Sequence, residues 1–246
     1  MQTQPRFLTK SLFSLAMKCP TKLYYAGKKE YPNRTLGDPF LQALADGGFQ
    51  VGELARAYYR HEGEAVMVDE TDPNRAKCMT YDLLQKDSVV LFEPAFEYKN
   101  LFMRADILKK EGDVLHLIEV KAKSYNSNEQ AGFLTKKGTV RSEWQPHLLD
   151  LAFQYFVLGK AMPGCTVKPY LMMPDKAKRC PTDGLNQRIR IKRLLNGKGV
   201  EIYSEFTEED LRERILEEVP AEEAVCALLE GRIDSLHDML DGKTLE

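Results

Sequence analysis

The most informative stretch of the chain is Phe96–Lys123, which reads FEYKNLFMRADILKKEGDVLHLIEVKAK. Two runs rich in leucine, β-branched and aromatic residues, Leu101–Leu108 and Val114–Val120, flank a polar segment that contains Gly112. Such runs predict strands, and the segment between them has the composition of a hairpin turn. The stretch therefore predicts two antiparallel strands that lie side by side.

Charged side chains take core positions at one end of this predicted hairpin. Because side chains alternate along a strand, Glu119 and Lys121 share a face with Leu117. A turn centred on Glu111-Gly112 places Asp106 opposite Leu117, and therefore diagonal to Glu119 on the same face. Diagonal neighbours lie roughly 7–8 Å apart, which lets two carboxylates share a divalent cation.

A cation is expected beside these acids, because burying carboxylates near one another is costly unless positive charge neutralises them. Mg²⁺ is the natural candidate for oxygen ligands of this kind. The alternative interpretation is a hairpin with a surface Glu-Lys pair and a solvated Asp, since short charged patterns also arise by chance.

The set Asp106…Glu119-Val120-Lys121, on a strand hairpin with a helix on each side, resembles the PD-(D/E)XK nuclease superfamily and, within it, the RecB-like exonuclease branch. The resemblance covers roughly residues 7–175. Further blocks resemble those of an uncharacterised bacterial family of that branch: Leu8-Thr9-Lys10-Ser11, Cys19-Pro20, Leu23-Tyr24, Val51–Arg56 and Asp150–Tyr155.

The resemblance implies an α/β fold with a restriction-endonuclease-like core, in which a central mixed sheet of αβββαβ topology is flanked by helices. It also implies a metal-dependent deoxyribonuclease that cleaves phosphodiester bonds in DNA, with RNA as a second substrate to consider. Asp106, Glu119 and Glu53, together with the Val120 carbonyl, would hold one or two Mg²⁺ or Mn²⁺ ions. The alternative for Glu53 is a solvated helix residue beside Arg56.

Two further residues receive roles from the resemblance. Lys121 would position the nucleophile, and Gln154 would orient the substrate or Lys121. The chain departs from the branch at this glutamine, because Leu158 replaces the motif's tyrosine four residues on and Tyr155 is instead adjacent to Gln154. The alternative for Gln154 is a hydrogen-bonded amide in the core. His61, near the end of the helix that carries Glu53, is a substitute candidate for Glu53 in the metal site. The alternative for His61 is a surface residue at the helix end.

Capping signals and periodicity predict the remaining elements. The expected helices are a short one capped by Ser11, one that starts at Asp38-Pro39 and is interrupted at Gly47-Gly48, Phe49–Tyr59, Glu143 to about Met162, Leu211–Val219, and one from Pro220 to Leu229. The expected strands are Val89–Phe96, Thr166–Met173 and the pair Arg188–Leu195 with Val200–Tyr203, of which Thr166–Met173 runs parallel to an earlier strand.

The chain is long enough for one large or two small domains, with 246 residues of which 43% are hydrophobic. We expect a nuclease domain over 1–200, with an N-terminal helical clamp at 1–60. Residues 201–246 are expected to form an acidic helical appendage or a connection to a further module. Its acidic helices would then dock a partner domain or subunit.

The distribution of charge says more than the formal net charge of −2. Lysines of the N-terminal clamp, such as Lys18 and Lys22, would contact phosphates or lie on a solvated surface. A second basic segment is expected to contact nucleic acid through Lys176, Lys178, Arg179, Arg188, Arg190, Lys192 and Arg193.

The five cysteines are odd in number and widely spaced, which favours reduced thiols over a disulfide framework. Some RecB-like nucleases hold an iron–sulfur cluster, but the spacing of Cys19, Cys165 and Cys180 makes such a cluster an unlikely cofactor. The sequence shows neither a signal peptide nor a membrane-spanning run, so we expect a cytoplasmic protein without a membrane partner.

Two other functions compete with the nuclease. The first is a non-catalytic nucleic-acid-binding module that uses the fold and the basic segment without turnover. The second is a partner-docking subunit of a DNA-processing complex. The presence of Asp106, Glu119 and Lys121 together favours the enzyme.

Overall fold

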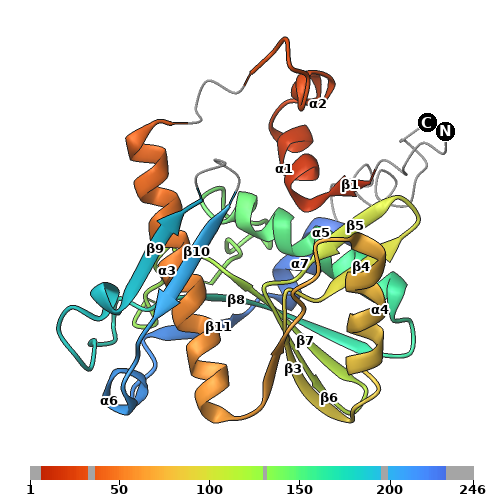
Figure 1. The fold of residues 1–246 in the computed structure, drawn as a ribbon. Coiled ribbons are helices and arrows are strands. Elements are labelled where there is room, and N and C mark those ends of the chain that lie inside the picture. Colours follow the sequence, from red (N-terminus) through yellow and green to blue (C-terminus); the bar gives the residue numbers. More distant parts are fainter. Residues whose placement is uncertain (1–6, 33–36, 130–131, 195–198, 231–246) are drawn as a thin grey trace.

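The predicted hairpin lies in the middle of a six-stranded mixed sheet, in a mixed α/β fold (Figure 1). The computed structural model describes residues 7–32, 37–129, 132–194 and 199–230. Across the sheet the order is β11 (Leu216–Pro220), β8 (Thr166–Pro174), β7 (Val114–Val120), β6 (Ile107–Glu111), β3 (Ser88–Phe92) and β2 (Ala65–Met67).

Two smaller sheets accompany the large one. The three-stranded sheet has the order β1 (Leu8–Thr9), β5 (Leu101–Arg104) and β4 (Ala95–Tyr98), and the two-stranded sheet pairs β9 (Ile189–Arg193) with β10 (Val200–Ser204). The helices are α1 (Lys10–Lys18), α2 (Pro20–Tyr25), α3 (Pro39–Glu62), α4 (Pro73–Leu83), α5 (Gln145–Ala161), α6 (Glu208–Leu211) and α7 (Glu222–Glu230), with a 3₁₀ turn at Leu185–Arg188. Within the described ranges no helix combines the length and apolar character needed to cross a membrane.

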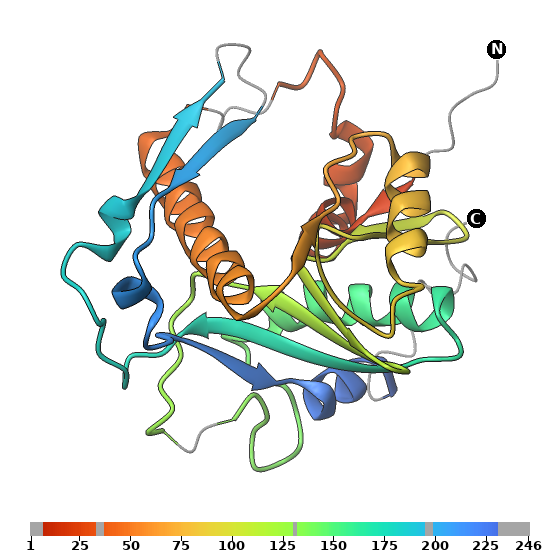
Figure 2. The ribbon, with the colours of Figure 1, turned by 60° about the horizontal axis from the view of Figure 1, so that its bottom comes forward.

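Helices cover both faces of the large sheet, with α3 on one side and α5 and α7 on the other (Figure 2). Leu115 and Leu117 of β7 are fully buried in the layer that includes α5, whereas Ile118 packs into the layer that includes α3. Full burial of such side chains contributes roughly 1.5–3 kcal/mol each. The expected alternation of β7 is therefore confirmed, and α5 covers the face that carries Glu119 and Lys121.

The hairpin register differs from the prediction by two positions. Leu108 pairs with Leu117 and Ile107 with Ile118, and the turn consists of Gly112 and Asp113. Gly112 has a φ of 57°, which suits the first central position of a two-residue hairpin turn. The turn therefore lies one residue later than predicted. Extending this register places Asp106 directly opposite Glu119 rather than diagonal to it.

A bend interrupts the strands expected at Val89–Phe96 and Leu101–Leu108. The register that pairs β3 with β6 continues into the pairing of β4 with β5, but the chain bends at Glu93-Pro94 and Ala105-Asp106. Pro94 has no N–H to donate, and Glu93 has a φ of 55°, a conformation that costs a non-glycine residue on the order of 1 kcal/mol. The bend transfers the chain from the large sheet to the three-stranded one.

Helix α3 is continuous from Pro39 to Glu62, so the predicted interruption at Gly47-Gly48 is wrong. A glycine inside a helix costs roughly 1 kcal/mol relative to alanine, and the burial of Leu54 and Tyr58 further along the helix outweighs that cost. The cap of α1 is Thr9 rather than Ser11, because the Thr9 side chain accepts a hydrogen bond from the Leu12 N–H.

The predicted helix at Leu211–Val219 is also wrong, because Leu216–Pro220 forms β11, antiparallel to β8 at the edge of the large sheet. Thr207 and Asp210 form a capping box just before this segment, but the helix that they start, α6, ends at Leu211. The helix expected from Pro220 to Leu229 is confirmed as α7, and the part of the expected appendage at 231–246 lies outside the described residues. For Leu216–Pro220, pairing with the backbone of β8 therefore overrides the local preference for a helix.

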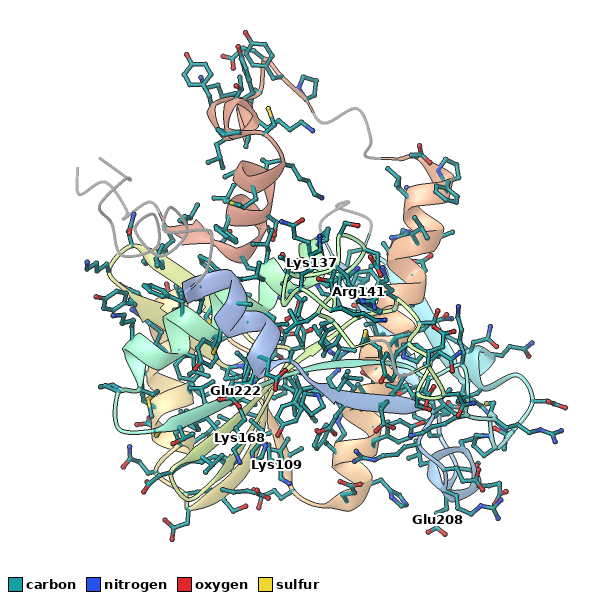
Figure 3. All side chains as sticks on the ribbon, turned by 180° about the vertical axis from the view of Figure 1, so that it is seen from behind. Lys109, Lys137, Arg141, Lys168, Glu208 and Glu222 are labelled. Carbon is teal, nitrogen blue, oxygen red and sulfur yellow. The ribbon has the colours of Figure 1, made fainter. Side chains whose placement is uncertain are left out.

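The other predicted long-range feature is confirmed: β8 runs parallel to β7, and α5 forms the crossover between them. Lys109, His116 and Lys168 follow one another across β6, β7 and β8, and Figure 3 shows Lys109 and Lys168 near each other on the back of the molecule. The carboxylates of Asp106 and Glu119 lie at the other end of the hairpin from its turn, at the start of β6 and the end of β7.

Candidate functional site

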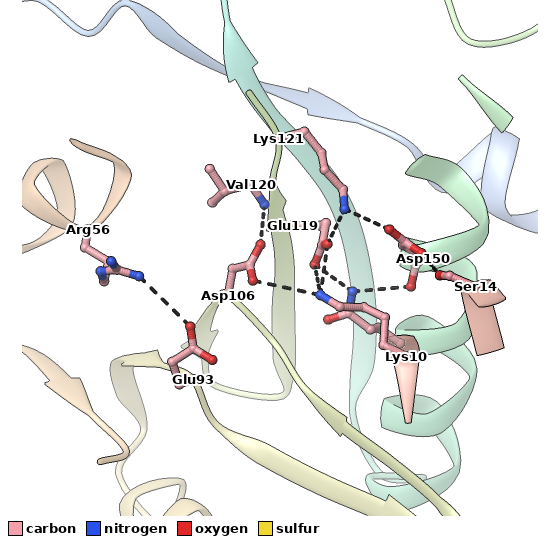
Figure 4. A network of polar contacts seen from close by, with 10 residues as sticks. Lys10, Ser14, Arg56, Glu93, Asp106, Glu119, Val120, Lys121 and Asp150 are labelled. Carbon is pink, nitrogen blue, oxygen red and sulfur yellow. Dashed lines mark hydrogen bonds and ion pairs between the residues drawn. The ribbon is translucent and has the colours of Figure 1, made fainter. Parts of the chain in front are cut away.

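Glu119 is the centre of a network of charged side chains at the end of β7 (Figure 4). Its side chain is 1% exposed. Lys10 Nζ lies 3.0 Å from both carboxylate oxygens, and Lys121 Nζ lies 2.8 Å from Oε1. Gln154 Nε2 donates to Oε2 at 2.6 Å. A buried carboxylate is thus matched by two ammonium groups and one amide, as burial of a charge requires.

Asp106 lies beside this centre because the bend of the hairpin ends just before β6. The Val120 N–H donates to Asp106 Oδ2 at 2.8 Å, which fixes the carboxylate across from Glu119. Its other oxygen, Oδ1, lies 3.9 Å from Lys10 Nζ. The ammonium of Lys10 therefore sits between two carboxylates that come from neighbouring strands.

Lys121 links the sheet to α5. Its ammonium lies 2.8 Å from Asp150 Oδ2 as well as 2.8 Å from Glu119 Oε1. Ser14 of α1 donates a hydrogen bond to the other oxygen of Asp150. Glu119 and Asp150 hold the Lys121 ammonium in a fixed position. Electrostatic catalysis requires charged groups that are fixed in this way.

Helix α1 reaches the site because it is anchored on two sides. Strand β1, directly before it, pairs in parallel with β5, and the ring of Phe13 stacks on that of Phe153 in α5 at 5.0 Å between centroids. Lys10 and Ser14 are four residues apart and so point the same way from the helix. The sequence predicts Lys10 as one of the clamp lysines that would contact phosphates and as part of a block of the resembling family, but not as a partner of the carboxylates.

The pKa values of the two central acids move in opposite directions. Burial, together with the negative charge of Glu119, raises the pKa of Asp106 to about 7. Burial acts on Glu119 as well, but the ammonium groups of Lys10 and Lys121 outweigh it and lower the pKa of Glu119. Burial opposes the charge of Lys121, yet Glu119 and Asp150 raise its pKa above the ordinary value. Glu119 and Lys121 are therefore charged at neutral pH, and Asp106 titrates near it.

This difference predicts how binding of a cation depends on pH. A carboxylate binds a metal in its deprotonated form, so Mn²⁺ affinity should rise by about tenfold per pH unit up to about pH 7 and then level off. The pKa of Asp106 is raised on folding, so its contribution to the stability of the metal-free protein is complete below about pH 4 and is lost as the pH rises to about 7. Calorimetric titration with Mn²⁺ at several pH values measures the first effect; an affinity independent of pH from 5 to 7 would contradict it.

The structure does not bring Glu53 to the other two acids. Its carboxylate lies 3.0 Å from Arg56 Nε and 2.9 Å from Arg60 Nη1, and it accepts a hydrogen bond of 2.8 Å from Ser204. Burial opposes these partners, but Ser204 and the two arginines together lower the pKa of Glu53. The preceding residue, Gly52, lines the same cavity as Asp106 and Glu53 does not, because consecutive helix residues point about 100° apart.

An acid that the sequence analysis did not single out, Glu93, lies closer to Asp106. Both side chains line a cavity of about 370 Å³, together with Gly52, Arg56 and Val120. Arg56 Nη1 is 4.0 Å from Glu93 Oε1. Burial raises the pKa of Glu93, with Arg56 acting against it. The bend opposite Asp106, which places Glu93 there, was not readable from strand patterns.

The two glutamates give a matched pair of variants. Glu93→Gln should weaken Mn²⁺ binding roughly tenfold, because it removes a negative charge from the cavity that Asp106 lines. Glu53→Gln should leave Mn²⁺ binding within twofold of wild type but lower the melting temperature, because it removes the charge that pairs with Arg56 and Arg60. Calorimetry and thermal melting on both variants check this, and the reverse order of metal affinities would restore Glu53 as the third acid.

Three further residues that the sequence predicts for the site are Gln154, Val120 and His61. Gln154 is fully buried and reaches Glu119, so it is both a core amide and a contact of the site, while its Oε1 has no hydrogen-bond partner within the described part of the chain. Val120 contacts Asp106 through its N–H; its carbonyl as a metal ligand stays a prediction. His61 lies exposed near the end of α3.

The basic segment lies away from the carboxylates, and acids match several of its charges. The ion pairs are Lys178 with Glu217, Arg188 with Asp210, Lys192 with Glu201 and Arg193 with Asp46. Arg190 lines a separate small cavity with Tyr203. Lys176 and Arg179 are exposed in the loop after β8. Contact of this segment with nucleic acid stays a prediction.

Two of the cysteines named for a cluster, Cys165 and Cys180, are separated by the length of β8. Cys165 directly precedes β8 and Cys180 follows that strand, so the two lie toward opposite ends of a nine-residue strand. A strand of this length spans roughly 30 Å, which is far beyond the reach of a shared cluster.

No protein-family model, curated protein or solved structure matches this chain. Among the described residues, no group of three or more His, Cys, Asp or Glu side chains is arranged to hold a metal ion. The geometry of Glu119 and its neighbours is therefore the main indication of function.

Proposed function

We propose that this protein is a metal-dependent nuclease that hydrolyses phosphodiester bonds in DNA. The observation that carries the proposal is the buried Glu119, flanked by Asp106 on one side and by Lys121 on the other (Figure 4). Burial and the charge of Glu119 raise the pKa of Asp106 to about 7, and pKa values perturbed in this way cluster at functional sites.

The order of elements supports the finer description of the fold as restriction-endonuclease-like. Strands β3, β6 and β7 form an antiparallel meander, and α5 then crosses to β8, parallel to β7. With α3 before the meander, and β2 and α4 between them, this succession supports the αβββαβ order that the resemblance implies. Strands β2 and β11 extend the sheet at its two edges.

The donor set fits a divalent cation. Lys10 Nζ already stands as a positive charge between the carboxylates, at 3.0 Å from Glu119 and 3.9 Å from Asp106. Asp106 and Glu119 would hold the metal, and Lys10 would give up its position between them. A bound Mg²⁺ or Mn²⁺ lowers the pKa of water and stabilises charge on a phosphate.

The side chains of this chain then have distinct tasks. Lys121 supplies a fixed positive charge next to Glu119, where it can orient the attacking water and stabilise the negative charge that develops on the phosphate. Asp150 and Ser14 hold Lys121 in place through the contacts described above. Gln154 fixes the orientation of the Glu119 carboxylate.

The proposal is tested by incubating the purified protein with labelled single- and double-stranded DNA and RNA in Mg²⁺, Mn²⁺ or EDTA. We expect cleavage of DNA in either metal and none in EDTA. Absence of metal-dependent cleavage of every one of these substrates would refute the nuclease.

One observation favours a second candidate, a nucleic-acid-binding module without turnover. Lys10 and Lys121 already neutralise Glu119 without any metal. In that case the protein would bind DNA equally well in EDTA and in Mg²⁺ and would leave it intact.

A further inference from the structure

A second feature of the chain is the arm formed by α1, α2 and the residues that follow, residues 10–32, which starts at Lys10 of the carboxylate network and extends beyond it. Figure 1 shows α1 rising from the sheet and α2 standing away from it. Every side chain of α2 is at least partly exposed. Tyr24 is 66% exposed and Tyr31 is 57% exposed, so the arm presents large aromatic surfaces to solvent.

The tyrosines of the arm form one cluster. The rings of Tyr24 and Tyr25 meet edge to face at 5.0 Å between centroids, and those of Tyr25 and Tyr31 at 4.6 Å. Lys28 Nζ lies 3.2 Å from the centroid of the Tyr24 ring, a cation–π contact. Exposed aromatic rings interleaved with lysines are the arrangement with which proteins stack unpaired bases and hold the adjoining phosphates.

The charge of the arm is strongly positive. Residues 10–32 contain a single acidic residue, Glu30. Of the five lysines in the same range, Lys10 is paired with Glu119, and Lys18, Lys22, Lys28 and Lys29 lie further along the arm. A chain with a formal net charge of −2 thus concentrates positive charge on one projecting element. Such an element is better suited to bind a polyanion than the rest of the protein surface is.

A surface connects the arm to the candidate site. A cavity of about 460 Å³ is lined by Met17 and Lys18 at the end of α1 and by Lys121 and Asp150 of the carboxylate network. Ser14, which bonds to Asp150, lies between them on α1 and lines the same cavity. The cavity therefore joins Lys18, at the end of α1, to Lys121.

We propose that the arm is a binding site for single-stranded nucleic acid, with bases stacked on the cluster of Tyr24, Tyr25 and Tyr31 and the backbone followed by Lys18, Lys22 and Lys29. Stacking on these rings needs unpaired bases, because the faces of paired bases in a duplex are already covered. The path along α1 would deliver the strand to Lys121, and this last step rests on the proposed nuclease function.

The test measures binding of a fluorescently labelled oligo(dT) and of a blunt duplex in EDTA, by anisotropy, so that it needs neither metal nor cleavage. The variant Tyr24→Ala/Tyr25→Ala/Tyr31→Ala should bind the single strand at least about tenfold more weakly than wild type. Phe40→Ala is the matched control, because Phe40 is also an exposed aromatic residue, at 70%, but lies on α3, outside the arm and the basic segment. It should bind as wild type does.

A second pair of variants tests the charges without changing the rings. Lys22→Ala/Lys29→Ala should reduce the slope of log affinity against log salt by about 1.4, because each lost phosphate contact of a single strand changes it by about 0.7. Lys137→Ala/Lys168→Ala removes two exposed lysines elsewhere and should leave the slope unchanged (Figure 3).

Wild-type affinity for oligo(dT) in a triple tyrosine variant that keeps the wild-type melting temperature would overturn the proposal and leave the arm as a protein-docking surface. Failure of the nuclease gives a different result. The arm variants would still lose single-strand binding in EDTA, while the wild-type protein cleaves no nucleic acid in Mg²⁺ or Mn²⁺.

Discussion

Cleavage of DNA by the Lys121→Ala protein is expected to be slower than that of wild type by about 10²–10³-fold, as is typical for the loss of a preorganised electrostatic group. Binding of Mn²⁺ and of DNA should remain nearly intact. The physical reason is that Glu119 and Asp150, each 2.8 Å from the Lys121 ammonium, hold it in a position where, in the proposed reaction, its charge would act on the reacting phosphate. Single-turnover cleavage and filter binding on the same preparation separate the two effects.

Lys123→Ala is the matched control for this variant. Lys123 lies two residues further on and is engaged by the Glu143 carbonyl and the Trp144 ring rather than by the carboxylates. It should cleave at the wild-type rate. If Lys121 only neutralises its neighbours, its removal will lower the melting temperature and leave cleavage unchanged. Wild-type cleavage by Lys121→Ala, in protein free of contaminating nuclease, would remove the catalytic role.

The second large effect is expected for the double variant Asp106→Asn/Glu119→Gln. Calorimetric Mn²⁺ binding should be lost and metal-dependent cleavage should fall below detection, because both carboxylates that face Lys10 lose their charge. Amide replacements are chosen because they keep the shape of the side chains in a buried network.

Glu111→Gln serves as the control, since Glu111 is an exposed acid at the turn end of the same hairpin, and it should bind Mn²⁺ as wild type does. The folded state of the double variant is checked by its circular dichroism spectrum and melting curve. A folded double variant that still binds Mn²⁺ with wild-type affinity would exclude these acids as the metal site.

Much of the central fold was predictable from the sequence alone. The alternation of Val114–Val120 placed Leu117, Glu119 and Lys121 on one face, and the structure covers that face with α5. The parallel strand after α5 was also predictable, because an apolar strand that follows an amphipathic helix returns to the same sheet by a crossover. These features are encoded by periodicity within a single element, so neighbouring residues are enough to reveal them.

The tertiary structure alone decided the details of the site. The hairpin register depended on whether the turn used Glu111 or Asp113 beside Gly112, and a local pattern does not distinguish the two. The bend that puts Glu93 opposite Asp106 arises where the paired chain segments leave the large sheet, as β3 and β6, and enter the three-stranded sheet, as β4 and β5. In the same way, Leu216–Pro220 became a strand because β8 offered it an unpaired edge.

Lys10 shows most clearly what the sequence alone could not predict. It lies 109 positions from Glu119 in the sequence, yet its ammonium contacts both oxygens of that carboxylate. The sequence determined that a buried acid pair at Asp106 and Glu119 would require a positive partner, because isolated charges are costly to bury. Only the packing of α1 on α5 decided which cation takes that place, since contacts between distant segments depend on how whole elements pack and not on the pattern of either segment.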